Sequence, residues 1–466
     1  MDLKKCQIFT PTNIVNFMLD QIDYKKDILN KTIIDISCGD GQFLKQIVYR
    51  IIETCKTLNY SDGEIKAQLE NCVYGIEKED RLVNQCVSNL NEVAKNHHVE
   101  NIDWNITCGD GLEALGEYDF VVGNPPYIAY KDLDIETRKS VKDRFNSCAL
   151  GKFDYSYAFI EKGLELLKAN GQMVYITPGN MFKTVFGQQL RELIKPYLTC
   201  VIDCAEEKIF PKALTSPMIT LYKKSNSSKF IKYSKLNLNG KVQASKIIKN
   251  QLCRKWIFTD YVSEGKRRFG DYFKVSNCVA TLSNNIFVHN MDDKGDLDIE
   301  VEDEILRPAV SPKSLKKNIR QRIIFPYRYE GGKLIRYSEE DIRLLFPKAL
   351  QYLENNKKDL TSRDLDGNVK WFEYGRTQAL AYLNNRKLLI SSIMTGSLNV
   401  YELDEETVPY SGFYIIPKEG SNMSLEFALE MLQSADMCSY LLSCGIRVNG
   451  ESVRLSTKDI ENYIFI

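Results

Sequence analysis

The residues best suited to chemistry are Asn124-Pro125-Pro126-Tyr127, which follow the apolar run Val121-Val122-Gly123. Two consecutive prolines fix two φ angles, remove two N–H donors and bias Asn124 toward an extended conformation. Carbonyl oxygens at the end of this strand then have no nearby N–H partner, and they lie beside an aromatic ring. The motif predicts a rigid acceptor pocket for a flat group with an amino function. The alternative is an ordinary loop capped by Tyr127.

Acidic residues recur at the ends of three predicted strands, at Asp35, Glu77 and Asp110. In an open α/β sheet the ligand crevice lies at the carboxyl ends of the strands, so these acids are expected to converge there. Gly39 and Gly41 let the backbone approach a ligand closely. Leu44 stands where a dinucleotide fingerprint needs its third glycine, which argues against a nicotinamide cofactor. A glycine turn, an acid for two ribose hydroxyls and an acid for an adenine amino group together predict a nucleoside-shaped site.

The elements that would position these groups alternate between strand and helix through the first 225 residues. Strands are predicted at 32–36, 72–77, 104–107, 172–176, 200–202 and 218–222, and one ends at 124. Helices are predicted at 13–22, after the segment 37–44 to about 57, and at 80–94, 154–168 and 188–194. This alternation predicts an α/β fold with a mostly parallel sheet.

Length and composition bound the class of protein. The chain has 466 residues, 44% of them hydrophobic, and equal numbers (62) of basic and acidic side chains, which predicts a globular protein with two domains. Thirteen cysteines without a Cys-x-x-Cys pair, and only three histidines, suggest a reducing cytoplasm and no metal site. We expect no signal peptide and no membrane segment.

The second half differs in charge. Between Leu221 and Gly270 there are 13 Lys and Arg against 2 Asp and Glu, with aromatic residues interleaved. Such a stretch is either a solvated face or a contact surface for a polyanion. Strand and helix signals are mixed after residue 225, so 226–466 is predicted to be a separate domain.

In these motifs and their order, nearly the whole chain resembles the gamma-class, S-adenosylmethionine-dependent DNA adenine N(6)-methyltransferases. Asn124 to Tyr127 match the catalytic motif. The resemblance implies cofactor contacts from Phe9, Thr10, Asp35, Cys38, Gly39, Gly41, Glu77, Asp110 and Asn124. It also implies a Rossmann-like methyltransferase domain over 1–225 and a mixed α/β DNA target recognition domain over 226–466.

The resemblance further implies a reaction on double-stranded DNA in which the target adenine swings out of the duplex. Asn124 and Pro125 would accept the two amino hydrogens, and Tyr127 and Phe210 would stack on the base. Lys223, Lys224, Lys266, Arg267 and Arg268 are predicted to contact phosphates. Arg376 and Gln378 are chemically able to read guanine and adenine edges, or else are structural partners of Glu373.

Other readings stay open. A protein-glutamine methyltransferase or an RNA methyltransferase would use the same Asn-Pro-Pro-Tyr pocket. A catalytically inactive DNA-binding module is a further alternative, but the intact Asn124 to Tyr127 motif argues against it. The segment Phe9-Thr10-Pro11 resembles the N-terminal motif of the family. We expect no nuclease before this motif, so a restriction endonuclease would be a separate chain, or the enzyme would be solitary. A monomer is expected.

Overall fold

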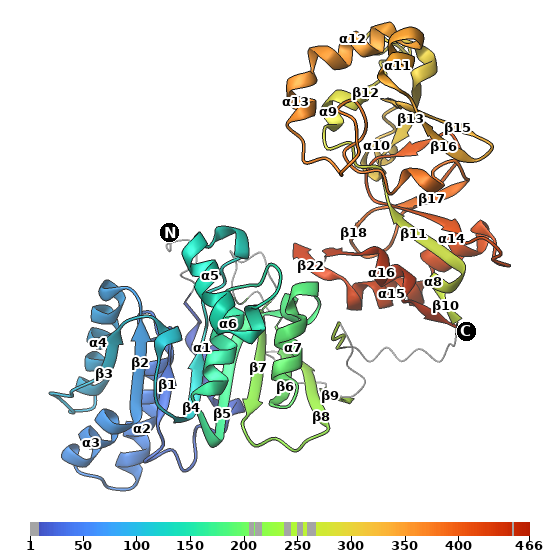
Figure 1. Cartoon of the computed structure of the whole chain (residues 1–466). Coiled ribbons are helices and arrows are strands. Elements are labelled where there is room, and N and C mark those ends of the chain that lie inside the picture. The colour runs from blue at the N-terminus through green and yellow to red at the C-terminus, as the bar shows by residue number, and fades with distance from the viewer. Residues whose placement is uncertain are drawn as a thin grey trace. The chain divides into compact units, whose positions relative to one another are not determined.

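The computed structural model describes residues 9–204, 209, 217–236, 244–248, 255–258, 267–449 and 452–466. The chain forms two compact units, Met1–Asp260 (unit 1) and Tyr261–Ile466 (unit 2), and each is described by itself (Figure 1). Phe210 and Lys266 lie outside the described residues. No helix among the described residues is both long and apolar enough to cross a membrane.

Unit 1 is built on one nine-stranded sheet of order β3-β2-β1-β4-β5-β7-β6-β8-β9. Neighbours from β3 to β5 are parallel, whereas β7 runs antiparallel between β5 and β6, and β8 and β9 extend the edge. The strands are β1 (Ile33–Asp35), β2 (Val73–Glu77), β3 (Asn105–Cys108), β4 (Tyr118–Gly123), β5 (Leu167–Pro178), β6 (Leu198–Asp203), β7 (Pro217–Lys223), β8 (Phe230–Lys235) and β9 (Ala244–Ile248). The predicted α/β fold with a mostly parallel sheet is confirmed.

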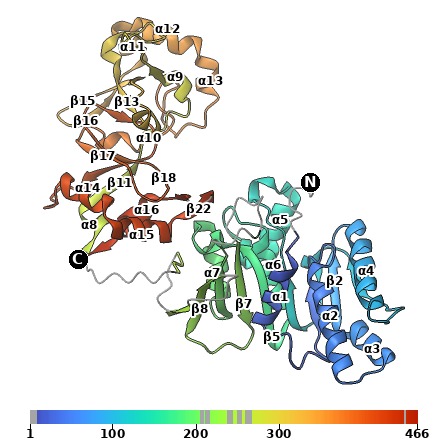
Figure 2. The same cartoon turned by 180° about the vertical axis from the view of Figure 1, so that it is seen from behind.

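Helices cover both faces of this sheet because its central strands are apolar on both sides. Ile33, Val122 and Val174 belong to one core, and Ile34, Val121 and Met173 belong to the other, as the period of two requires. The first core takes in α1 (Thr12–Gln21), α2 (Gln42–Thr57), α3 (Asp62–Cys72) and α4 (Asp80–Lys95), and the second takes in α5 (Ile135–Arg144), α6 (Ser156–Glu165) and α7 (Gln188–Ile194). Figure 1 looks onto α6 and α7, and the reverse view of Figure 2 looks onto α1 and α2.

The boundary between the units lies at 260 and not at 225 as expected from the sequence. Residues 226–260 stay with the first unit because β8 pairs with β6 and β9 pairs with β8. Trp256 also stacks on Phe182, with ring centroids 5.7 Å apart, in the second core of unit 1. The basic stretch is therefore divided between the two units.

Unit 2 mixes small sheets and helices around its own core, as the irregular pattern predicts. Its two four-stranded sheets have the orders β11-β21-β17-β19 and β12-β14-β13-β20. Their strands are β11 (Phe273–Asn277), β12 (Val288–Asn290), β13 (Leu306–Val310), β14 (Gln321–Ile324), β17 (Lys387–Ile390), β19 (Val400–Leu403), β20 (Val408–Pro409) and β21 (Phe413–Pro417).

Smaller elements complete unit 2. The other strands are β10 (Arg267–Arg268), β15 (Tyr327–Glu330), β16 (Lys333–Arg336), β18 (Ile393–Met394), β22 (Ile446–Asn449), β23 (Ser452–Arg454) and β24 (Ile464–Phe465). The helices are α8 (Phe269–Tyr272), α9 (Asn284–Phe287), α10 (Pro312–Lys316), α11 (Glu339–Leu345), α12 (Pro347–Asn355), α13 (Lys357–Thr361), α14 (Leu425–Gln433), α15 (Ala435–Cys444) and α16 (Thr457–Glu461).

Candidate functional site

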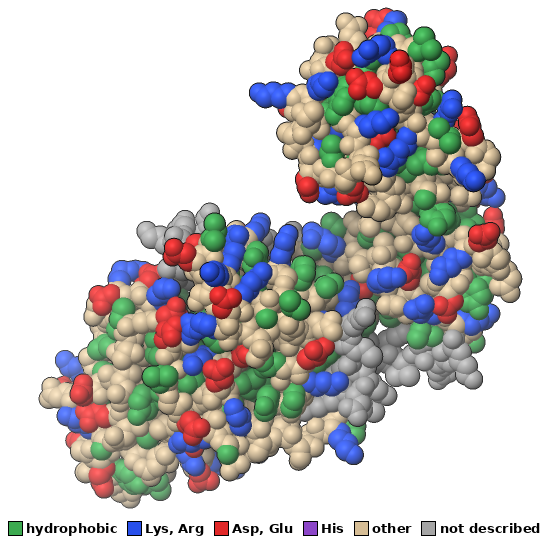
Figure 3. Space-filling view, in the orientation of Figure 1, with side chains coloured by type: hydrophobic (Ala, Val, Ile, Leu, Met, Phe, Trp, Pro, Cys, Tyr) green, Lys and Arg blue, Asp and Glu red, His purple; other side chains and the backbone are tan. Residues whose placement is uncertain are grey.

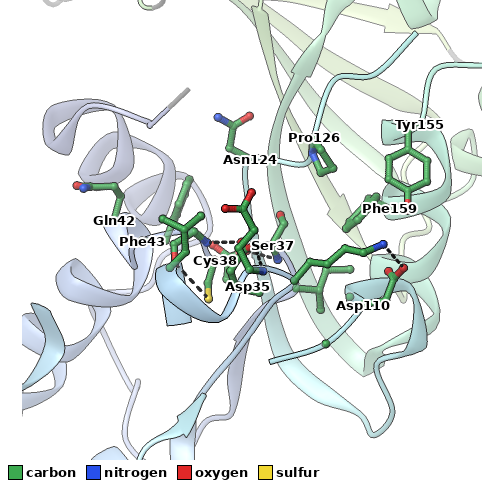
Figure 4. A pocket seen from close by; sticks show the side chains of 18 of the residues that line it. Asp35, Ser37, Cys38, Gln42, Phe43, Asp110, Asn124, Pro126, Tyr155 and Phe159 are labelled. Atoms are coloured by element: carbon green, nitrogen blue, oxygen red, sulfur yellow. Dashed lines mark hydrogen bonds and ion pairs between the residues drawn. The ribbon is translucent and has the colours of Figure 1, made fainter. Parts of the chain in front are cut away.

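A pocket opens in unit 1 where the segments after β1, β2, β3 and β4 meet. Its empty volume is about 1080 Å³, which includes the open solvent at its mouth. In Figure 4, Asp35 lies near the centre and Asn124 above it. Gln42 and Phe43 line one side, and Tyr155, Phe159 and Asp110 line the other. The sequence-predicted acids therefore converge as expected from the strand order.

The glycine loop after β1 is anchored by Glu77 at the end of β2. The Gly39 N–H donates to Glu77 Oε2 and the Glu79 N–H donates to Glu77 Oε1, both at 3.0 Å. Gly41 has φ +86°, a left-handed conformation, and a Cβ there would lie 2.7 Å from Cys86 Sγ. Cys38 is buried beside this turn. The carboxylate thus holds the loop while its remaining lone pairs can accept hydroxyl groups of a ligand.

Asp35 is the buried acid of the site. Burial, reinforced by the negative charge of Glu77, raises the pKa of Asp35 to about 7. Its Oδ1 accepts the Ser37 N–H at 3.0 Å, and a Cβ on Gly123 would lie only 2.6 Å from the same oxygen. Glycine at 123 therefore leaves room for this carboxyl directly beside the strand end that carries Asn124.

The third acid, Asp110, lies at the far side of the pocket. It accepts the Leu112 N–H at 3.0 Å and faces Lys78 Nζ at 3.4 Å. Next to it, a Cβ on Gly111 would lie 1.9 Å from the Ile36 carbonyl oxygen, so only glycine fits. This close approach draws the segment after β3 toward β1.

Apolar side chains that the site prediction did not include complete the walls. They are Phe43, Leu82, Ile128, Tyr155 and Phe159. Phe153-Asp154-Tyr155 fits the resemblance in the sequence, and that was the available signal for Tyr155. Phe43, Leu82, Ile128 and Phe159 reach the pocket through tertiary packing, which the sequence pattern does not reveal.

The N-terminal motif also reaches the pocket. Phe9 lies over Gly39, where a Cβ would be 3.4 Å from Phe9 Cε1, and the Phe9 side chain is otherwise exposed. Thr10 is buried, and its Oγ1 has no hydrogen-bond partner within the described part of the chain. A buried hydroxyl that lines a pocket in this way is available to a ligand.

The Asn-Pro-Pro-Tyr motif leaves β4 at the mouth of the pocket. Asn124 and Pro126 line the pocket, and Pro125 between them is buried. Tyr127 donates its hydroxyl to the Ile176 carbonyl on β5 at 2.7 Å, and burial raises its pKa well above the usual value. The motif is thus fixed to the neighbouring strand β5 where it leaves β4, and Asn124 lies above Asp35 among the residues that line the pocket (Figure 4).

The sequence and the fold of the chain are similar to those of known proteins. Residues 42–210 match the family described as Eco57I restriction-modification methylase.

Individual relatives and a solved structure agree with the family match. The chain is 23% identical to the Type II restriction enzyme and methyltransferase RM.Eco57I of Escherichia coli, over 84% of this chain and 49% of that protein. It is 23% identical to the Type II methyltransferase M.BstVI of Geobacillus stearothermophilus, over 96% of this chain and 87% of that protein. The fold matches the Type IIL restriction-modification enzyme MmeI, solved in complex with DNA, with a TM-score of 0.64, 14% identity, and 97% of this chain and 65% of MmeI covered. The chain thus spans about half of RM.Eco57I and about two thirds of MmeI.

The cofactor expected from the sequence, S-adenosyl-L-methionine, is that of the homologous methyltransferases. The residues present fit it. Glu77 offers carboxylate oxygens for ribose hydroxyls, and Asp110 with the apolar walls suits an adenine ring. Asp35 and the Thr10 hydroxyl suit the ammonium group of the methionine end, and when bound the cofactor would supply an electrophilic methyl group.

The residues predicted to contact DNA are dispersed. On unit 1, Lys223 is exposed at the end of β7, whereas the Lys224 ammonium donates to the Leu164 carbonyl at 2.6 Å. On unit 2, Arg267 contacts the Ile466 carbonyl and the Phe465 ring, and Arg268 pairs with Asp271 at 2.8 Å.

Arg376 and Gln378 have partners other than those expected. Arg376 pairs with Asp364 at 2.9 Å and Asp366 at 3.1 Å, and the Gln378 amide donates to Asp366 at 2.8 Å. Glu373, the partner considered from the sequence, is instead buried against Arg336 at 3.4 Å. The two side chains thus share Asp366, and Arg376 also pairs with Asp364 in the same loop.

Proposed function

We propose that the chain transfers a methyl group from S-adenosyl-L-methionine to the exocyclic amino group of a flipped-out adenine in a specific duplex DNA sequence. It would serve as the modification part of a restriction-modification system or as a solitary enzyme. One observation carries the proposal: Asn124 and Pro126 line the same pocket as the acids and glycines suited to the cofactor. Acceptor and methyl donor would then share one cavity.

The chain's own contribution is to orient and polarise the amino group. The Asn124 side-chain oxygen and the Pro125 carbonyl would accept its two hydrogens, which increases electron density on the nitrogen and directs its lone pair toward the methyl donor. Tyr127, held by Ile176, would lie under the base, where stacking returns about 1–3 kcal/mol. This offsets part of the few kcal/mol that base flipping costs.

DNA binding is proposed to involve both units. Lys223 is exposed, and the exposed ion pair of Arg268 with Asp271 is of the kind that contributes little, so both side chains can turn to phosphates. Base readout by Arg376 and Gln378 would require them to leave Asp364 and Asp366. Specificity of this kind would come from exchanging the carboxylates of Asp364 and Asp366 for acceptor groups on the base edges.

The test is expression in a host that lacks DNA methylation, followed by modified-base sequencing. One sequence motif bearing N(6)-methyladenine is expected with the wild-type chain and none with Asn124→Ala, while calorimetry should show cofactor binding in both. Removing one preorganised hydrogen-bond partner of a reacting group typically costs about 100- to 1000-fold in rate. An unmodified genome would instead favour a protein or RNA substrate, and retained activity in Asn124→Ala would refute the assigned role.

A further inference from the structure

Three exposed apolar side chains form a patch on unit 1, here called the wedge patch: Leu150, Val185 and Phe186. Their exposed fractions are 67%, 75% and 44%. They belong together because the Phe186 ring lies on Gly151, where a Cβ would be 2.0 Å from Phe186 Cδ1, and because the Leu150 N–H donates to Gln189 Oε1 at 3.0 Å. Gly151 has φ +74°, which also favours glycine.

The wedge patch lies at the edge of the sheet that carries the catalytic motif. β4 and β5 are parallel neighbours, so the segment 179–187 leaves β5 at the same edge as Asn124 leaves β4. The Tyr155 N–H donates to the Ile128 carbonyl at 3.0 Å, and Ala129 pairs with Asp154. The segment that carries Leu150 is thereby joined to the segment that follows Asn124.

The loop that presents Val185 and Phe186 is held firmly. Arg191 is buried, and its guanidinium donates to the Met181 carbonyl at 2.7 Å and the Thr184 carbonyl at 2.8 Å. The Thr184 hydroxyl lies 3.4 Å from the hydroxyl of Tyr157 on α6. A loop held directly before its exposed tip presents its apolar side chains with little further ordering cost.

Charge near the wedge patch indicates the kind of partner. Lys152 is exposed two residues after Leu150, and residues 130–152 carry six Lys and Arg against four Asp and Glu, so this segment is basic on balance. In Figure 3, Lys and Arg side chains gather on the face of unit 1 over α5 and the adjoining ends of α6 and α7, with apolar side chains among them. A partner with an anionic surface and a stacked apolar interior fits this combination, and duplex DNA has both.

We propose that the wedge patch inserts into the duplex beside the target adenine and occupies the space that the base leaves when it swings out. This inference rests on the proposed function. Apolar wedges that enter base steps stabilise distorted DNA because they replace lost stacking contacts. The wedge patch would therefore act on the equilibrium between the stacked and the flipped base, and not on methyl transfer itself.

The test uses single-turnover methylation of two duplexes that carry the motif identified by sequencing. In one duplex the target adenine is paired with thymine, and in the other it faces an abasic site, so that it is already loosened. For Val185→Ser/Phe186→Ser we expect a rate about 10- to 100-fold below wild type on the paired duplex, since unstacking costs a few kcal/mol. The rate on the abasic duplex should stay near that of wild type.

Leu115→Ser is the matched control, because Leu115 is 83% exposed and precedes β4 at the opposite edge of the sheet. It should leave both rates unchanged. Equal losses on the two duplexes, or no loss on either, would overturn the wedge while leaving the proposed function standing. A wild-type chain that methylates neither duplex would overturn both. Leu150→Ser provides an independent variant with the same expected pattern.

Discussion

Asp35→Asn should make the protein more stable at alkaline pH, although it changes a residue of the proposed cofactor site. Burial raises the Asp35 pKa from 3.8 to about 7. The folded protein therefore holds a proton at Asp35 that the unfolded chain releases between about pH 4 and 7, so folding is progressively disfavoured as the pH rises through that window. Three pKa units correspond to about 4 kcal/mol. Asparagine keeps the oxygen that accepts the Ser37 N–H and removes the charge.

The measurement is denaturant unfolding of the cofactor-free protein between about pH 5 and pH 8. The stability difference between variant and wild type should grow with pH, to about 4 kcal/mol above pH 7. Asp119→Asn is the control with the opposite sign, because hydrogen bonds from Lys168 and Thr32 lower the pKa of the Asp119 carboxyl despite its partial burial. The stabilising contribution of the Asp119 carboxylate is lost as the pH falls. The free energy of unfolding of Asp119→Asn should therefore differ most from that of wild type at neutral pH. A pH-independent difference for Asp35→Asn would refute the role of burial.

Three further results are expected. Tyr127→Ala should lower the methylation rate about 10-fold, less than Asn124→Ala, because it removes stacking and not an acceptor; equal rates for the two variants would contradict this. Gly111→Ala should destabilise unit 1 by about 1–3 kcal/mol in denaturant unfolding, because its Cβ would lie 1.9 Å from a backbone carbonyl, while Gly63→Ala, with nothing within 4 Å, should not. Lys223→Glu should reduce the slope of log affinity for DNA against log salt by about one unit, and an unchanged slope would exclude a phosphate contact.

The sequence predicted the central part of unit 1 well because strand and helix there follow from local patterns. The strand expected at 218–222 is β7 at 217–223, and the acids at strand ends meet because parallel strands end at one edge. The antiparallel position of β7 between β5 and β6 depends on pairing between distant segments, which no local period encodes.

Contacts between segments distant in sequence also explain why the unit boundary and the partners of Arg376 differ from those expected. The basic composition of 226–260 suggested a new domain, but its strand β8 completes the sheet of unit 1 by pairing with β6. Arg376 was considered beside Glu373 because they are close in sequence. A loop instead brings Asp364 and Asp366 to its guanidinium, leaving Glu373 to Arg336.

The bond from the Tyr127 hydroxyl to the Ile176 carbonyl affects the conformational entropy of the Tyr127 ring. It fastens the aromatic ring to the neighbouring strand. In the proposed reaction, the ring would not need to be ordered anew when a base enters. The entropy of arranging this surface would then be lost once, during folding, and not in each catalytic cycle. A tyrosine at this position differs from a phenylalanine in that respect even though both rings stack equally well.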